Sequence, residues 1–324
     1  MGRVLSLSES RLQSISDTTG HSADLIEKVL KIEELLQDIF RHPFLRERLV
    51  LKGGTGLKFC YFNKPRLSVD IDLNYIGAID IENMKRERPK IDTALMKIFK
   101  DKEYTILREP GEEHAGGKYR LRFNNIYGDN RNVEFDINYL FRVPIGEPEK
   151  KAFKAFDDSK VFNLLIVSKE ELFAGKVVAA LDRATARDIY DVANISDYTN
   201  MYDKQLFRAS VILFGVSKRE DFRKVSYEKL TTISEGDIEN ELYPLLPRDK
   251  RIQRIELLDK ALPFVSDLLG FTLQEKNFLD RFLDNADYKP EILFAEYPKL
   301  VPKLHRHPAV LWKRLNVERY LKRY

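Results

Sequence analysis

The chain has 324 residues, of which 43% are hydrophobic and 33% charged, a composition typical of a soluble protein with a large core. No run of about 18 apolar residues occurs, which excludes a membrane-spanning helix, and the N-terminus lacks a signal-peptide core. Cys60 is the only cysteine, so an internal disulfide is excluded and we expect a cytoplasmic protein. The net charge of +4 conceals a strongly basic C-terminus.

The N-terminal part of the chain predicts one helix. Residues 1–20 are rich in serine, and we expect them to be loosely ordered. Apolar residues then recur at helical spacing from Ala23 to Phe40. We therefore expect residues 1–40 to form an N-terminal helical segment.

The next segment has the features of a phosphate site. A short apolar strand, Leu49–Leu51, leads into Gly53-Gly54-Thr55-Gly56, which can turn sharply before a helix begins at Leu57. Glycines let backbone N–H groups approach phosphate oxygens, and a helix start adds a partial positive charge. The segment is not a Walker A loop, because Phe59 follows Lys58, and it lacks the Gly-x-Gly-x-x-Gly dinucleotide pattern.

Two aspartates follow on a predicted strand. Asp70-Ile71-Asp72-Leu73 alternates polar and apolar residues, so both carboxylates lie on one face, roughly 6.5–7 Å apart. Like charges on one strand face repel each other, and a divalent cation removes this repulsion. The alternative is a half-exposed edge strand with solvated acids. The glycine segment just upstream favours a metal site.

A two-metal site requires a third carboxylate. In the predicted strand over residues 131–140, Glu134, Asp136 and Asn138 share one face. Asp136 is the first candidate and Glu134 the second, because a shorter side chain holds a metal more rigidly. The alternative is an amphipathic strand with a polar outer face.

A charged helix carries the second group of candidate residues. A capping box predicts a helix that begins at Ser168 and continues to Asp191. Three cations fall within a narrow angular range on it: Lys176, Arg183 and Arg187. Asp188 lies on the adjoining flank. We interpret these cations as a nucleotide clamp; the alternative is a solvated stripe with an Arg187–Asp191 pair.

The remaining pattern predicts a mixed α/β core and a helical second domain. We expect a helix over residues 81–100, strands over 104–107, 118–124 and 130–141, and a connector over 143–148. Residues 165–324 are expected to be largely helical, with breaks at prolines. The predicted domains are therefore residues 1–40, 41–150 and 151–324.

The C-terminus is basic and aromatic. Residues 299–324 hold eight lysines or arginines and one acid, a net charge of +7 that leaves −3 for residues 1–298. Trp312, Tyr320 and Tyr324 offer flat surfaces for unpaired bases, so we expect an RNA contact that weakens with salt. The alternative is a solvated terminal helix docked by Leu311, Leu315 and Leu321. We expect Trp312 itself to be a core residue rather than a stacking surface.

Three motifs in a fixed order carry a resemblance to a known family. They are Gly-Gly-Thr-x-Leu at residues 53–57, Arg-x-Ser-x-Asp-x-Asp-Leu at 66–73, and Lys-x-x-Ala-x-x-x-Arg-x-x-x-Arg-Asp-x-x-Asp at 176–191. Over about residues 20–195 the chain resembles the AbiEii/AbiGii-type nucleotidyltransferase toxins. Members have a DNA-polymerase-β-like core followed by a helical domain, and act in toxin–antitoxin or abortive-infection modules. Some modify tRNA acceptor ends.

The resemblance implies a role for each matching residue. Thr55 and Ser68, with Gly53 and Gly54, contact nucleotide phosphates, and Asp70 and Asp72 hold Mg²⁺. Lys176 contacts the triphosphate, supported by Arg183 and Arg187, and Asp188 completes the site. Asp136 is matched only by its strand context, because the third acid varies within the family.

The implied function is an α/β nucleotidyltransferase core joined to an α-helical domain. The enzyme uses two Mg²⁺ ions and transfers NMP from an NTP to an acceptor hydroxyl, with the tRNA 3′ end as the favoured acceptor. An antitoxin partner is implied as well. One alternative is an acceptor that is a protein or a small molecule, and another is a non-catalytic module that binds nucleotide or a partner. The sequence does not specify which NTP or which RNA.

Overall fold

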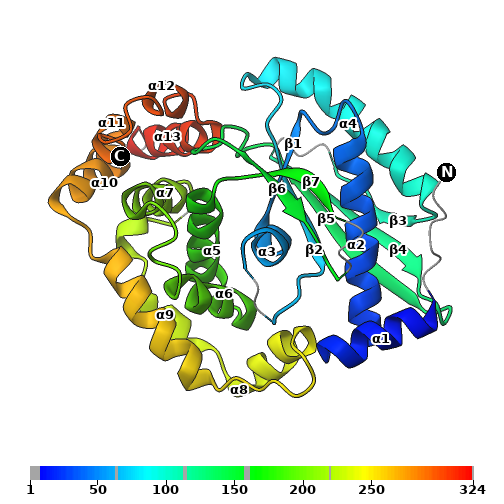
Figure 1. The fold of residues 1–324 in the computed structure, drawn as a ribbon. Coiled ribbons are helices and arrows are strands. Elements are labelled where there is room, and N and C mark those ends of the chain that lie inside the picture. The colour runs from blue at the N-terminus through cyan, green and yellow to red at the C-terminus, as the bar shows by residue number, and fades with distance from the viewer. Residues whose placement is uncertain (1–7, 63–64, 112–114, 157–160, 219, 323–324) are drawn as a thin grey trace. The chain divides into compact units, whose positions relative to one another are not determined.

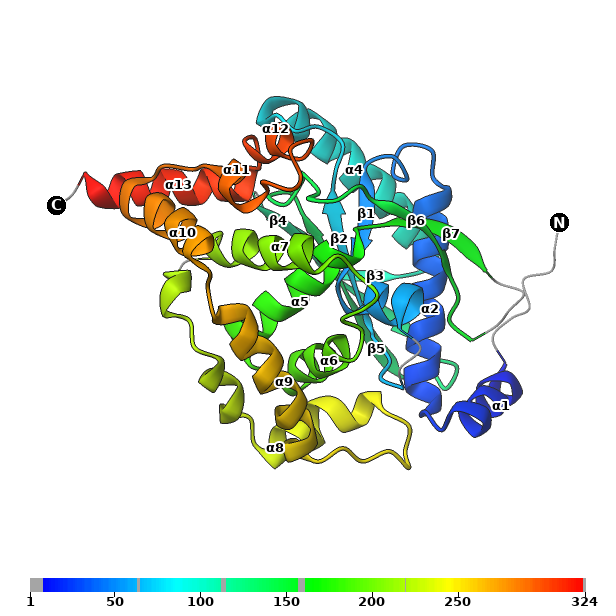
Figure 2. The same ribbon diagram turned by 60° about the vertical axis from the view of Figure 1, so that its left-hand side comes forward.

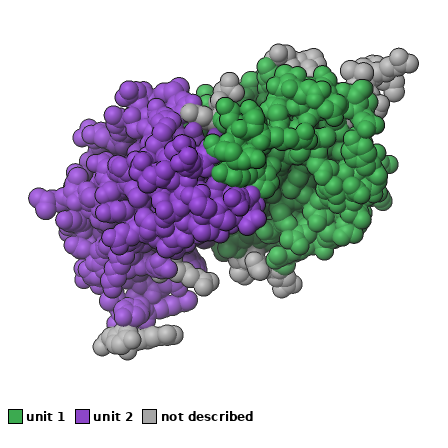
Figure 3. All heavy atoms as spheres, turned by 90° about the horizontal axis from the view of Figure 1, so that it is seen from below, with its two compact units in different colours: residues 1–139, 150–166, 242–251 green, residues 140–149, 167–241, 252–324 purple. Residues whose placement is uncertain are grey.

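A computed structural model describes residues 8–62, 65–111, 115–156, 161–218 and 220–322 (Figure 1). Contacts divide the chain into two units, coloured separately in Figure 3. Unit 1 comprises residues 1–139, 150–166 and 242–251, and unit 2 comprises residues 140–149, 167–241 and 252–324. The division differs from the expected boundaries at residues 40 and 150, because the N-terminal helices and residues 150–166 belong to the unit that holds the sheet.

Unit 1 contains a seven-stranded mixed sheet with the strand order β3-β4-β5-β2-β1-β7-β6. The β2–β5 and β1–β7 pairs are parallel, whereas β1–β2, β3–β4 and β4–β5 are antiparallel. The strands are β1 Leu49–Lys52, β2 Asp70–Tyr75, β3 Thr105–Arg108, β4 Gly116–Asn124, β5 Asn130–Asn138, β6 Glu149–Phe153 and β7 Phe162–Ile166. The predicted mixed α/β core is confirmed.

Strands β6 and β7 were not predicted. β6 reads Glu-Lys-Lys-Ala-Phe, and only Phe153 in it is fully buried, so the sequence shows no clear alternation. β7 pairs with β1 through Ile166 and Leu51, two residues far apart in the chain. Such a pairing depends on the assembled sheet rather than on local pattern.

The helices of unit 1 are α1 Glu9–Thr19, α2 Ala23–Arg41, the short α3 Gly53–Gly56 with the π-helix Leu57–Tyr61, and α4 Ile81–Asp101. The expectation of loose order is wrong for residues 9–19, and residues 1–7 lie outside the described residues. Ser8 caps the start of α1 by accepting a hydrogen bond from Arg11 N, and Gly20 ends the helix in the left-handed region. Leu12 packs with Ile26 and Leu30 of α2.

One face of the sheet is apolar and covered. Helix α2 contacts β5, β7 and α4. Phe99 of α4 packs edge-on against Tyr119 of β4 and Phe135 of β5, with ring centroids 5.4 Å apart in both pairs. The intervening residues of β2, β4 and β5 therefore point to the opposite face. That polar face carries Asp70, Asp72 and Asp136.

Unit 2 is helical, as predicted. Its main helices are α5 Lys169–Arg183, α6 Ala186–Ser196, α7 Lys204–Val216, α9 Arg254–Leu269, α10 Leu273–Asn285 and α13 Pro308–Leu321. Its short elements are the 3-10 turns Phe222–Lys224 and Tyr227–Thr232, α8 Glu235–Asp237, the π-turn Ile238–Leu242, α11 Pro290–Leu293 and α12 Val301–Leu304. The 3-10 turn Tyr243–Leu245 belongs to unit 1. α7 contacts α5, α10 and α13 (Figure 2). None of the helices in the described ranges has the length and hydropathy needed to cross a membrane.

The predicted continuous helix over residues 168–191 is wrong. Helix α5 ends at Arg183, because Ala184 adopts the left-handed conformation with φ 52°. Thr185 then caps α6 by accepting a hydrogen bond from Asp188 N. A threonine N-cap with an acid three residues later favours a new helix start. Lys176 and Arg183 therefore lie on α5, whereas Arg187 lies on α6, and the three cations do not share one helix face.

Candidate functional site

The glycine segment joins β1 directly to a helix. We expected a sharp turn over residues 53–56 and a helix from Leu57, but α3 already begins at Gly53 and continues into the π-helix. Lys52 is the N-cap residue and provides no side-chain cap. No side chain therefore satisfies the N–H groups of the first turn by capping.

Gly53 is required by two features of its position. Its φ of +73° lies in the region that side-chain-bearing residues rarely adopt. A Cβ atom at Gly53 would also lie 2.8 Å from Cβ and 2.9 Å from Cγ of Asp72. The absence of a side chain at Gly53 is therefore what leaves room for the Asp72 carboxylate.

Thr55 fastens the glycine segment to β2. Its side chain is fully buried, and its hydroxyl donates a hydrogen bond of 2.5 Å to the carbonyl oxygen of Asp70. In the free protein the Thr55 hydroxyl therefore holds the two segments together, and the contact of Thr55 with a nucleotide phosphate stays a prediction. Ser68 is also buried, two residues before Asp70.

The acids of β2 and β5 lie in a cross-strand row. The register places Lys52 of β1 opposite Asp72, Asp72 opposite Asp136, and Asp136 opposite Lys118 of β4. Neighbouring strands lie about 4.8 Å apart. Two carboxylates thus stand side by side with a lysine on each flank, on the face that alternation predicted.

The environments of the two third-acid candidates differ. Burial and the neighbouring charge of Asp72 raise the pKa of Asp136, although Lys52, Lys118 and Arg108 oppose this shift. Glu134 instead accepts a hydrogen bond from Arg120 Nε and pairs with Lys118 Nζ at 3.3 Å. Burial would raise the pKa of Glu134, but these two cations outweigh it and lower the pKa.

This difference supports Asp136 over Glu134 as the acid that acts with Asp72. The Glu134 carboxylate already forms ion pairs with Lys118 and Arg120, and its pKa is lowered. Burial and the charge of Asp72 instead outweigh the nearby cations and raise the pKa of Asp136. A divalent cation would relieve the repulsion between Asp72 and Asp136.

The donor set fits Mg²⁺ bound together with a nucleotide. No group of three or more His, Cys, Asp or Glu side chains within the described ranges is arranged to hold a metal ion by itself. Mg²⁺ is usually bound by one or two carboxylates plus substrate phosphates rather than by an all-protein cage. Asp72 and Asp136 provide such a pair, and Asp70 lies two residues away on the same strand face.

Unit 2 contains a compact network of opposite charges. Lys176 Nζ lies 2.8 Å from Asp191 and 3.9 Å from Asp188, and the lysine side chain is 12% exposed. Asp188 also accepts hydrogen bonds from Arg183 Nε at 3.0 Å, from Arg183 Nη2 at 2.8 Å and from the Thr185 hydroxyl at 2.7 Å. Asp188 thus joins the end of α5 to the start of α6 and orients two cations.

The exposed face of α13 differs from the one expected. Leu315 and Leu321 are 51% and 42% exposed, so they do not dock the helix. Trp312 is 43% exposed and is not a core residue. The buried residues of α13 are Ala309, Val310, Lys313 and Val317. The two C-terminal residues, Arg323 and Tyr324, lie outside the described residues.

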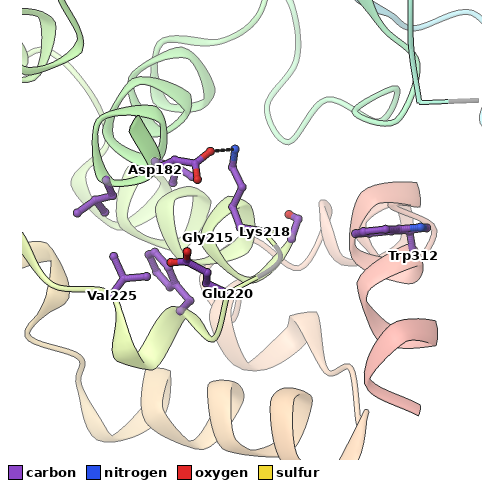
Figure 4. A pocket seen from close by; sticks show the side chains of 10 residues that line it. Asp182, Gly215, Lys218, Glu220, Val225 and Trp312 are labelled. Atoms are coloured by element: carbon purple, nitrogen blue, oxygen red, sulfur yellow. Dashed lines mark hydrogen bonds and ion pairs between the residues drawn. The ribbon is translucent and has the colours of Figure 1, made fainter. Parts of the chain in front are cut away.

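Trp312 lines a cavity of about 390 Å³ that was not predicted from the sequence (Figure 4). Its walls come from α5, α7, α13 and the loop after α7: Val178, Leu181, Asp182, Gly215, Ser217, Lys218, Glu220, Phe222, Val225 and Trp312. Lys218 Nζ pairs with Asp182 at 2.7 Å. The cavity therefore combines an aromatic wall with polar groups.

Comparison with known proteins defines the class. The sequence model of the family described as nucleotidyl transferase AbiEii toxin, type IV toxin–antitoxin system, matches residues 34–283. The chain belongs to this family and is a nucleotidyltransferase, as the three motifs predicted. A search of curated proteins gives no match.

The fold is similar to that of MenT4, a nucleotidyltransferase toxin from Mycobacterium tuberculosis. The TM-score is 0.63 at 18% sequence identity, and the match covers 93% of this chain and 99% of MenT4. Membership of the AbiEii family implies an NTP substrate, use of a divalent metal and an antitoxin partner.

The close approach of Gly53 to Asp72 predicts that Gly53→Ala lowers nucleotidyl transfer by about 100-fold or more, because the new methyl group displaces the carboxylate. Gly128→Ala is the matched control: Gly128 also has a positive φ, +86°, but no atom lies within 4 Å of its Cβ position. Transfer rates and melting temperatures of both variants separate the clash from backbone strain. Equal losses of transfer would contradict the assignment.

The raised pKa of Asp136 predicts a stability that depends on pH. The folded protein holds the Asp136 proton more tightly than the unfolded chain, so ionised Asp136 destabilises the fold above its ordinary pKa of about 3.9 and has no such effect below it. Asp136→Asn should therefore melt at a higher temperature than wild type at pH 7.5 in EDTA. The gain should vanish near pH 4. A lower melting temperature at pH 7.5 would show that Asp136 is paired favourably.

Proposed function

We propose that the protein transfers NMP from an NTP to an acceptor hydroxyl in a Mg²⁺-dependent reaction, with the tRNA 3′ end as acceptor and pyrophosphate as the second product. We place this activity in the cytoplasm. The observation that carries the proposal is the pair of carboxylates, Asp72 and Asp136, in register on parallel strands beside an uncapped helix start. Family membership supplies the reaction class.

In this proposal the residues of unit 1 position the reacting groups. Asp70, Asp72 and Asp136 would hold Mg²⁺, which would supply charge neutralisation to the phosphates and Lewis-acid activation to the acceptor hydroxyl. The N–H groups at Gly53 and Gly54 bind phosphate oxygens. The acceptor hydroxyl loses its proton to solvent as its oxygen forms a bond to the α-phosphorus. The bond from the α-phosphorus to the bridging oxygen breaks, and pyrophosphate leaves with the electron pair.

The cations of unit 2 serve the leaving group. Lys176 contacts the triphosphate, and its amine is kept in place in the free protein by Asp191 and Asp188. Arg183 and Arg187 add positive charge where negative charge develops. Asp188 is a positioning residue, because it acts through Arg183 and the Thr185 cap.

An RNA acceptor is supported by the C-terminal helix. α13 exposes Trp312 and Tyr320 together with Arg314, Arg319 and Lys322. Exposed aromatic and cationic side chains on one element are typical of surfaces that bind unpaired bases and phosphates.

The proposal is tested by incubating the protein with each labelled NTP, Mg²⁺ and total tRNA. Wild type should label a tRNA-sized species, and Asp72→Ala and Lys176→Ala should reduce labelling by about 10²–10³-fold, because each removes charge stabilisation from the transition state. Lys85→Ala is the control, because Lys85 is an exposed lysine of α4 whose partner is Glu82. Label on a polypeptide or a small molecule, and none on tRNA, would show that the acceptor is not tRNA. No label with any acceptor would indicate a non-catalytic module.

Trp312 provides a direct probe of the C-terminal helix, because it is the only tryptophan in the chain. Adding tRNA should change the tryptophan fluorescence, and the midpoint should move to higher tRNA concentration as salt rises. Trp312→Ala should weaken tRNA binding by about 5- to 100-fold, the effect of losing one stacked base. Leu273→Ala, which truncates another exposed apolar side chain of unit 2, should have no effect. An unchanged spectrum would exclude α13 from the interface.

A further inference from the structure

The polar face of the sheet continues beyond the acids as a cationic surface. On β4, Lys118, Arg120 and Arg122 alternate with the buried side chains of Tyr119, Leu121 and Phe123. The Lys118 and Arg120 side chains are 44% and 53% exposed. The edge strand β3 adds Arg108, which pairs with Arg120 in the register. We call Arg108, Lys118, Arg120 and Arg122 the cationic sheet face.

This surface begins one strand from the acid pair. Lys118 lies directly opposite Asp136, and Arg120 lies opposite Glu134. Lys118 and Arg108 are close enough to lower the pKa of Asp136. Successive cations on β4 are about 6.8 Å apart, at about 3.4 Å of rise per residue. The cations thus form a row along β4. At Lys118 this row lies next to Asp136 of β5, which in turn lies next to Asp72 of β2.

The cationic sheet face has more positive charges than ion-paired carboxylates. Glu134 is the carboxylate with which Lys118 and Arg120 form ion pairs, so two cations share one acid. Exposed ion pairs of this kind contribute little to stability. The arrangement leaves net positive charge on a surface next to the candidate reaction centre, where it can attract an anionic substrate.

We propose that the cationic sheet face binds the phosphodiester backbone of a single-stranded nucleic acid, so that its terminal hydroxyl reaches the acids of β2 and β5. This inference rests on the proposed nucleotidyl transfer and identifies the surface that receives the acceptor. Several cations in a row can each contact one phosphate of a nucleic-acid backbone. The three phosphates of an NTP are too close together to contact all of them. A protein acceptor would call for exposed aromatic or aliphatic residues at the centre of the surface. Among the described residues of β3 and β4, Leu107 alone is a large apolar residue with an exposed side chain. The surface therefore lacks the apolar centre of a protein interface.

Glu134 has a defined part in this proposal. In the free protein its carboxylate holds Lys118 and Arg120 beside Asp136. Phosphate oxygens compete with that carboxylate for the same two cations. Glu134 therefore lowers the affinity for nucleic acid while it keeps the cations extended on the surface.

The test measures binding without NTP or divalent metal, so that it does not depend on catalysis. A labelled single-stranded RNA oligonucleotide is titrated with protein at several salt concentrations. Lys118→Gln combined with Arg120→Gln should raise Kd by about 10-fold or more, and the slope of log K against log salt should become shallower by about 1.4, or 0.7 per lost phosphate contact. Lys85→Gln with Lys100→Gln removes the same charge from exposed positions on α4, the helix against the other face of the sheet, and should leave Kd within about twofold.

Glu134→Gln provides a test of opposite sign. If its carboxylate competes with phosphate, the variant binds the oligonucleotide several-fold more tightly than wild type. Weaker binding by Glu134→Gln, or equal Kd for the two double variants, would overturn the proposal. RNA binding by the cationic sheet face without any nucleotidyl transfer would refute the proposed function and retain this surface. Transfer to tRNA by the Lys118/Arg120 variant with unchanged RNA affinity would refute the surface and retain the function.

Discussion

The contact between Gly53 and Asp72 is the constraint on which the candidate site depends. The backbone of the glycine segment passes so close to the Asp72 carboxylate that a single methyl group would not fit. The same segment is tied to β2 by the Thr55 hydroxyl, which bonds to the carbonyl of Asp70. Backbone N–H groups suited to phosphate and carboxylates suited to a metal are thereby held in one rigid arrangement, and their relative position does not rely on long side chains.

Electrostatics explains why this arrangement suits a metal-bound nucleotide. Burial raises the pKa of Asp136, the neighbouring charge of Asp72 adds to this shift, and Lys52, Lys118 and Arg108 offset only part of it. Additional positive charge would therefore stabilise the ionised form of Asp136. In unit 2, by contrast, the two positive charges of Lys176 and Arg183 are matched by the two negative charges of Asp188 and Asp191. In the proposed reaction, a divalent metal would supply positive charge to the acids of β2 and β5.

The parts of the site that follow from local pattern were predictable from the sequence. Alternation predicted that Asp70 and Asp72 share the polar face of one strand and that Asp136 lies on the polar face of a second strand. The structure confirms both strands. The register that sets Asp136 opposite Asp72 joins residues far apart in the chain, and no local pattern specifies it or the register that sets Lys118 opposite Asp136. The break at Ala184 was missed because alanine favours helix, although the Thr185 cap was visible in the sequence. The hydrogen bond from Thr55 to Asp70 was not predictable, because a hydroxyl in a glycine segment does not reveal its partner.

The central claim is that Asp72 and Asp136 together bind a divalent metal that carries the nucleotide. It is tested most directly by crystals of the protein grown with Mn²⁺ in place of Mg²⁺ and a non-hydrolysable NTP analogue, with anomalous diffraction recorded for manganese. An anomalous peak within coordination distance of both carboxylates and of a phosphate oxygen is the predicted result. Ordered nucleotide with manganese bound elsewhere, or bound by Glu134 instead of Asp136, would contradict the account.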